Sequence, residues 1–175
     1  MMFRFGEDRV TFIENIIGLA LKEFSVNNWQ AYYYIESPSR YNVLTENDKV
    51  KLSIDGTFIG INKDWLNATE NEYEVCTEVW YNVRKMFQHL QVRRFEKRDP
   101  GIVNDYIIKQ WAQIIRADGY DDDAQDVTTI TEIDANMFKY YMLRKYFGVA
   151  EYCLHEENAD DIVIRLAKEY NRCIA

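Results

Sequence analysis

Histidine and cysteine, on which many metal and redox sites depend, are scarce in this sequence. Its 175 residues include two histidines, His89 and His155, and three cysteines. The cysteines, Cys76, Cys153 and Cys173, lie far apart, form no C-x-x-C pair and each fall at an apolar position in a helix-like pattern. We therefore expect buried free thiols rather than metal ligands or a nucleophile.

Long apolar runs and a secretion signal are also missing. No run reaches membrane-spanning length, and the N-terminus lacks the basic start, apolar centre and small-residue cleavage site of a signal peptide. We expect a cytoplasmic protein that does not contact a membrane. The length and the 47% hydrophobic content predict a single domain, residues 1–175, with a sizeable core.

Positive charge is outweighed by negative charge: 21 Lys and Arg residues stand against 29 Asp and Glu, for a net charge of −8. Phosphate binding needs clustered lysine and arginine, so this balance disfavours nucleic acid as a direct partner. A partner protein with a basic surface is compatible with it. The sequence also lacks a G-x-S-x-G motif, a phosphate loop and a dinucleotide fingerprint, and we expect no cofactor.

The sequence does contain clear helix and strand patterns. Apolar residues at helical spacing predict helices at residues 10–24, 70–94, 102–117, 131–147 and 160–173, with Gly148 as a C-terminal cap. Runs of β-favouring residues predict strands at residues 29–35, 41–44, 50–54 and 58–61, with a hairpin turn at Asp55-Gly56. The order predicts an α+β fold in which helices pack on a small, mainly antiparallel sheet.

The helix at residues 70–94 is the element around which the others are arranged. Its approach, Thr69-Glu70-Asn71-Glu72, has the form of a capping box. Its apolar residues recur three and four positions apart and predict a buried face: Val75, Cys76, Val79, Trp80, Val83, Phe87 and Leu90.

Three segments, in order, resemble those of a family of small bacterial zincin-like metallopeptidase domains. In that family a strand ending in I-x-I-N leads to a helix with H-E-x-R-H-x-x-Q, and a later helix begins with E-x-D-A, whose glutamate completes the zinc site. The matching residues here are Ile61, Asn62, Arg84, Gln88, Glu132, Asp134 and Ala135. The resemblance implies a zincin-like fold for this chain.

The metal ligands of that family are replaced in this chain. Tyr81 stands at the first histidine, Asn82 at the glutamate and Lys85 at the second histidine. Two histidines one helical turn apart bind zinc, and the glutamate activates the bound water. Tyrosine is a poor zinc ligand at neutral pH, an amide is no base and an ammonium group repels a cation. The resemblance therefore implies a pseudoenzyme with no metal and no catalytic residues.

Without a metal, Glu132 needs another partner. The resemblance implies that Tyr81, Lys85 and Glu132 converge, and an unpaired buried carboxylate is costly. We predict a Lys85–Glu132 ion pair in place of the metal–glutamate bond, with Tyr81 donating a hydrogen bond to the same carboxylate. His89 follows Gln88, and the helical rotation turns it away from the Lys85 direction, so we do not expect it to bind metal.

The first functional hypothesis is a protein-binding or inhibitory module that takes up an extended partner by strand addition, with residues 58–61 as the edge strand. A specific version is a phage or mobile-element inhibitor of a nucleic-acid enzyme, whose basic channel accepts an acidic loop. The acidic residues of that loop, which lacks calcium-loop spacing, are Asp118, Asp121, Asp122, Asp123 and Asp126. The alternatives are a metallopeptidase with an atypical metal site and a structural domain whose resemblance is accidental.

Overall fold

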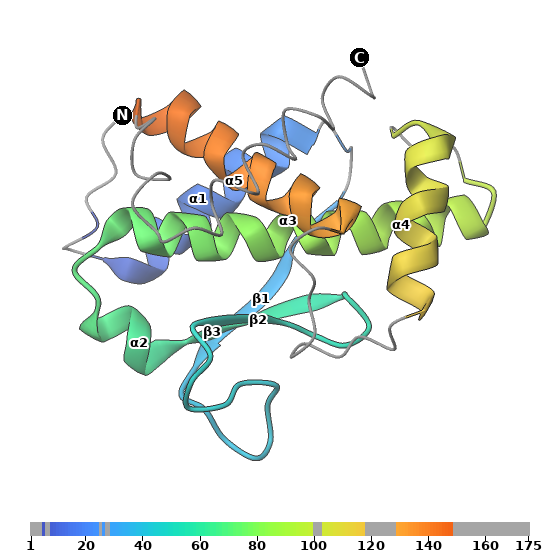
Figure 1. Cartoon of the computed structure of the whole chain (residues 1–175). Helices are drawn as coiled ribbons and strands as arrows, with labels where there is room; N and C mark the ends of the chain where they lie inside the picture. Colours follow the sequence, from blue (N-terminus) through green and yellow to red (C-terminus); the bar gives the residue numbers. More distant parts are fainter. Residues whose placement is uncertain are drawn as a thin grey trace. The chain divides into compact units, whose positions relative to one another are not determined.

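The computed structural model describes residues 5, 8–24, 26, 29–99, 103–117 and 129–148. The chain forms two compact units, Met1–Leu90 and Gln91–Ala175. Figure 1 shows the elements in chain order. The predicted helix at residues 160–173 lies outside the described residues. The single domain over residues 1–175 stays a prediction.

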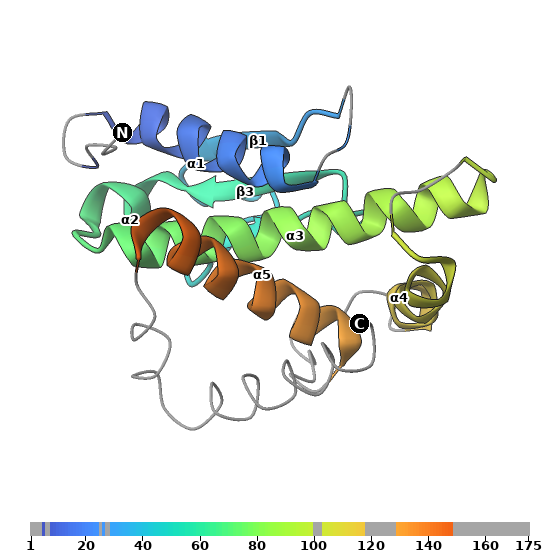
Figure 2. The same ribbon diagram turned by 90° about the horizontal axis from the view of Figure 1, so that it is seen from above.

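The first unit contains two long helical segments and a three-stranded sheet, and one short helix connects the last strand to the second long helix. Its elements are α1 (Arg9–Phe24), β1 (Tyr32–Glu36), β2 (Val50–Leu52), β3 (Phe58–Asn62), α2 (Lys63–Ala68) and the first part of α3 (Glu72–Glu96). α1 and this part of α3 run side by side on the same side of the sheet (Figures 1 and 2). The α+β class predicted from the sequence is confirmed.

The sheet has the strand order β1-β3-β2. β3 pairs in parallel with β1 and antiparallel with β2, so the sheet is mixed rather than mainly antiparallel. The prediction that residues 58–61 form an edge strand is wrong, because β3 is the central strand. Its Ile59 and Ile61 are fully buried. A run buried in this way is typical of an inner strand, and an edge is set by pairings that the local pattern does not contain.

The turn between β2 and β3 is the hairpin predicted from Asp55-Gly56. Gly56 has φ 67°, in the left-handed region that favours glycine. The Asp55 carboxylate accepts hydrogen bonds from the Thr57 amide at 3.1 Å and the Ser53 hydroxyl at 2.7 Å. These local bonds fix the turn, and with it the pairing of β2 and β3.

The strand predicted at residues 41–44 is absent from the structure, where this segment forms turns and irregular backbone. The Asn42 side chain accepts hydrogen bonds from the backbone amides of Ser39 and Leu44 and donates one to the carbonyl of Ser37. Side-chain bonds of this kind satisfy backbone groups locally and compete with strand pairing.

The helix α2 was not predicted, and Asn62 explains why it forms. The Asn62 side-chain oxygen accepts hydrogen bonds from the backbone amides of Asp64 at 2.9 Å and Trp65 at 3.2 Å. It therefore caps the helix that follows β3 directly. The Asn62 side-chain nitrogen also donates to the Asp48 carbonyl at 2.8 Å, which ties this junction to the start of β2.

The cap of α3 differs from the predicted capping box at Thr69. The Asn71 side-chain oxygen accepts hydrogen bonds from the amides of Tyr73 at 3.1 Å and Glu74 at 3.2 Å, so Asn71 caps the helix. The Thr69 hydroxyl donates instead to the Glu74 carboxylate at 3.1 Å. Two capping residues lie two positions apart in this segment, and the sequence pattern alone did not distinguish them.

The core of the first unit lies between α1, α3 and the sheet. The apolar stripe predicted for α1 consists of Ile13, Ile16, Ile17, Ala20, Leu21 and Phe24. All of these are buried except Leu21, which is half-buried. The Phe24 and Phe87 rings stack with centroids 4.4 Å apart. The Trp80 indole nitrogen donates to the Ile16 carbonyl at 2.8 Å, so this large side chain satisfies its one donor while fully buried.

The second unit contains the end of α3, α4 (Asp105–Ala117) and α5 (Ile130–Phe147), and α4 packs against α5. The Arg116 guanidinium pairs with the Glu96 carboxylate at the end of α3. α5 begins after Thr129, which caps it, and ends at Gly148, which has φ 67° and donates to the Arg144 carbonyl. The cap predicted at Gly148 is confirmed. No helix in the described ranges is both long and apolar enough to cross a bilayer.

Candidate functional site

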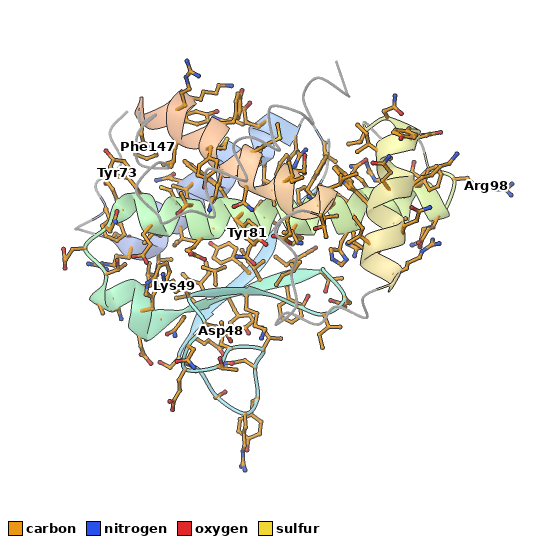
Figure 3. All side chains as sticks on the ribbon, viewed as in Figure 1. Asp48, Lys49, Tyr73, Tyr81, Arg98 and Phe147 are labelled. Atoms are coloured by element: carbon orange, nitrogen blue, oxygen red, sulfur yellow. The ribbon has the colours of Figure 1, made fainter. Side chains whose placement is uncertain are left out.

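Helix α3 carries Tyr81, Asn82 and Lys85, the three residues that the resemblance aligns with the metal-site positions of the resembling family. Tyr81 projects from the middle of α3 (Figure 3), and Lys85 follows one helical turn later. The Lys85 ammonium nitrogen lies 6.0 Å from the centre of the Tyr81 ring, within reach of a cation–π interaction. Lys85 is only 4% exposed, although lysine is rarely buried. The structure thus brings Tyr81 and Lys85 together as the helical spacing predicts.

Asn82 is buried beside them on the same helix. Its side-chain nitrogen donates to the Glu78 backbone carbonyl at 2.9 Å. An amide held in this way has no proton-accepting group comparable to a carboxylate. Its position therefore offers a structural hydrogen bond in place of a general base.

Arg84 lies against aromatic rings of the core of the first unit. Its guanidinium carbon is 4.8 Å from the centre of the Phe87 ring and 5.5 Å from that of Phe24. Planar guanidinium groups stack well on aromatic faces. Gln88, one turn further along α3, is fully buried. Both residues therefore contribute to packing of the central helix.

Glu132 and Asp134 lie in the first turns of α5, in the second unit. Both are buried, and Glu132 is 4% exposed. The Glu132 backbone amide donates to the Thr129 hydroxyl, and its carbonyl accepts from the Asn136 side chain at 2.9 Å. A carboxylate in the first turn is favoured by the helix dipole. The ion pair of Glu132 with Lys85, which belongs to the first unit, stays a prediction.

His89 packs beneath the β2–β3 turn and is buried. A methyl group built on Gly56 would come within 2.2 Å of the His89 ring carbon Cγ. This contact places the His89 ring against the turn. Among the described residues, no group of three or more His, Cys, Asp or Glu side chains is arranged to hold a metal ion.

Cys76 is free and fully buried on α3, as predicted. Burial raises the pKa of its thiol well above the ordinary value, and the nearby Glu72 carboxylate adds to the rise. Such a thiol is poorly nucleophilic at neutral pH. The other two cysteines, His155 and the five aspartates of the acidic loop at 118–126 lie outside the described residues.

The sequence interpretation missed the roles of Asn62 and Arg9. The Arg9 guanidinium donates to the carbonyls of Leu66 and Thr69 and lies 4.5 Å from the centre of the Phe5 ring. It therefore fixes the segment between α2 and α3 against the start of α1. The capping role of Asn62 had a local signal, since an acidic residue follows it in the first turn of α2. The Arg9 contacts join segments that are far apart in sequence, so no local sequence signal could have predicted them.

Comparisons with protein-family models, with curated proteins and with solved structures found no significant match to this chain.

Proposed function

We propose that this chain is a zincin-like domain that has no catalytic metal centre and acts as a protein-binding module. The observation that carries the proposal is the chemistry of Tyr81, Asn82 and Lys85 on α3. They occupy the three positions at which the resembling family has its two histidines and its glutamate. A buried ammonium group at one of them opposes a divalent cation.

The surroundings of these residues add support. The Asn82 side-chain amide donates a hydrogen bond to the Glu78 backbone carbonyl, one turn earlier in the same helix, so its role is structural. Asn62, at the end of the I-x-I-N segment, joins β3 to α2 and to the start of β2. The frame of the motif therefore has structural roles that do not depend on a metal, and a scaffold of this kind can persist without catalysis.

Zinc content tests the proposal most directly. Purified wild-type chain and the variant Tyr81→His/Asn82→Glu/Lys85→His are exposed briefly to zinc, desalted and analysed by mass spectrometry. We expect no stoichiometric zinc in the wild type and about one zinc per chain in the variant, whose histidines lie one turn apart.

A fourth substitution, Glu132→Gln in the triple variant, is the matched control. If Glu132 completes the restored site, this change lowers zinc affinity while leaving the two histidines in place. Stoichiometric zinc in the wild type would contradict the proposal and favour a metallopeptidase with an atypical site. Failure of the triple variant to bind zinc would remove the zincin-like part of the proposal.

The partner proposed is a protein with a basic surface, because the chain carries a net charge of −8. The specific version, an inhibitor of a nucleic-acid enzyme encoded by a phage or mobile element, depends on the acidic loop at residues 118–126. Replacing the five aspartates of this loop with asparagine should abolish inhibition of the target enzyme. Full inhibition by that variant would exclude this version.

A further inference from the structure

We propose that the outer edge of β1 binds an extended, basic segment of a partner protein, which joins the sheet as an additional strand. This inference rests on the protein-binding function proposed above and names the surface and the chemistry of the partner.

The strand order leaves two edges. β3 lies in the middle, so β1 and β2 each present one side away from it. Among the described residues no further strand pairs with the outer side of β1. The backbone amides and carbonyls that face outward from an edge strand form a template for another extended chain.

The two edges differ in the features that protect a strand from such pairing. β2 has three residues, and its middle residue is Lys51. Short length and an edge lysine both discourage strand addition. β1 has five residues, Tyr-Tyr-Tyr-Ile-Glu, with no lysine and no proline. Its pairing with β3 is continuous from Tyr32 opposite Phe58 to Glu36 opposite Asn62, so no bulge twists the edge away.

The side chains of β1 suit a bound strand. Tyr32 is 66% exposed, whereas most large apolar side chains of this unit are buried. An exposed aromatic residue on an edge strand can pack against a cross-strand neighbour of an added chain. Tyr34, on the same face, is fixed by its hydroxyl, which accepts a hydrogen bond from the Val43 amide at 3.2 Å. The strand is therefore held in place before any partner binds.

Negative charge accompanies β1 on both faces. Glu36, at its end, is exposed and shares a face with Tyr32. Tyr33 lies on the opposite face. Burial raises the pKa of Tyr33, and the negative charge of the exposed Glu14 on α1 raises it further. Lysine or arginine on both faces of an added strand would meet these carboxylates. Two copies of a chain with a net charge of −8 repel each other, so a basic partner segment is favoured over a second copy.

The probe for this test is a fluorescein-labelled eight-residue peptide of sequence Val-Lys-Lys-Val-Val-Lys-Lys-Val, in which consecutive lysines lie on opposite faces of an extended strand. Its binding is measured by fluorescence anisotropy at low salt. We expect saturable binding, weakened roughly tenfold by Glu14→Lys/Glu36→Lys. The matched control, Glu46→Lys/Glu70→Lys, makes the same change in net charge at exposed sites elsewhere and should weaken binding much less.

Two further measurements test the backbone pairing itself. The same peptide methylated at alternate backbone nitrogens should lose binding, because one edge of it no longer donates hydrogen bonds. Hydrogen exchange should slow in residues 32–36 on peptide binding and remain unchanged in β2. Equal binding of the methylated peptide, protection confined to β2, or an equal loss in the control variant would each overturn the proposal.

Self-association is the remaining outcome. A chain that is dimeric in sedimentation, and monomeric after Tyr32→Lys, would show that β1 pairs with a second copy and would overturn the basic-segment proposal. Failure of peptide binding leaves the zinc experiment untouched, because that experiment depends on residues of α3 and α5. The two proposals can therefore fail separately.

Discussion

The close contact between Gly56 and His89 makes Gly56→Ala an informative perturbation. Gly56 has φ 67°, and a methyl group there would lie 2.2 Å from His89 Cγ, 2.4 Å from Nδ1 and 2.6 Å from Cβ. The His89 ring is buried, so it has little room to move. Substitution therefore combines backbone strain with a steric clash in a packed region.

The two contributions can be separated with Gly148, which has the same φ of 67° and no described atom within 4 Å of its built methyl group. A left-handed conformation costs an alanine about 1 kcal/mol, so Gly148→Ala should lower the free energy of unfolding by about that amount. Overpacking adds about 1–3 kcal/mol, so Gly56→Ala should cost about 2–4 kcal/mol.

Urea denaturation of the four chains of a double-mutant cycle measures the clash. His89→Ala removes the ring atoms Cγ and Nδ1 but keeps Cβ, so the cycle measures the clash with the ring. The cost of His89→Ala should therefore be smaller in the Gly56→Ala background. We expect a coupling free energy of about 1–3 kcal/mol. Equal losses for the two glycine variants, together with a coupling near zero, would refute this account of the turn.

Three further predictions follow from buried polar groups and the central helix. Asn62→Ala removes the cap of α2 and the hydrogen bond to the Asp48 carbonyl, so it should lower the free energy of unfolding by about 2 kcal/mol in urea denaturation. The control is Asn67→Ala, at an exposed position of the same short helix, which should change that free energy by less than about 0.5 kcal/mol. With the other two cysteines changed to serine, Cys76 should react with a thiol reagent only as fast as the chain opens. The pKa of Cys76 is raised in the folded chain, so above the thiol's ordinary pKa of about 8.5 only the unfolded chain releases the proton. The free energy of unfolding should therefore fall as pH rises above that value. A free energy of unfolding that does not change across this pH range would contradict the prediction. Lys85→Met should cost about 3–5 kcal/mol if the ion pair with Glu132 forms, and a loss below about 0.5 kcal/mol would exclude the pair.

Much of the fold could be predicted from local patterns. The apolar stripe of α1, the long central helix, the Asp55-Gly56 hairpin and the Gly148 cap are all confirmed, because helix periodicity and turn chemistry depend on residues close in sequence. The strand predicted at 41–44 failed because Asn42 satisfies neighbouring backbone groups through its side chain. The cap of α3 was placed two residues too early because two capping residues lie close together.

The candidate site was predicted only in part. The helical spacing of Tyr81 and Lys85 follows from the sequence, and the structure brings the two side chains together. The hydrogen bond of Asn82 to Glu78 and the stacking of Arg84 on two rings were not foreseen, since they depend on rotamers chosen by the packed environment. The position of His89 under the turn likewise required the pairing of β2 and β3.

The sequence by itself determined where the long helices α1, α3, α4 and α5 form and how the hairpin turns, because these depend on residue type and spacing over a few turns. Only the tertiary structure decided that β3 is central and that β1 and β2 are the edges. Strand order comes from contacts between residues distant in the chain, which local hydrophobic patterns leave undetermined. The candidate binding edge therefore moved from residues 58–61 to β1.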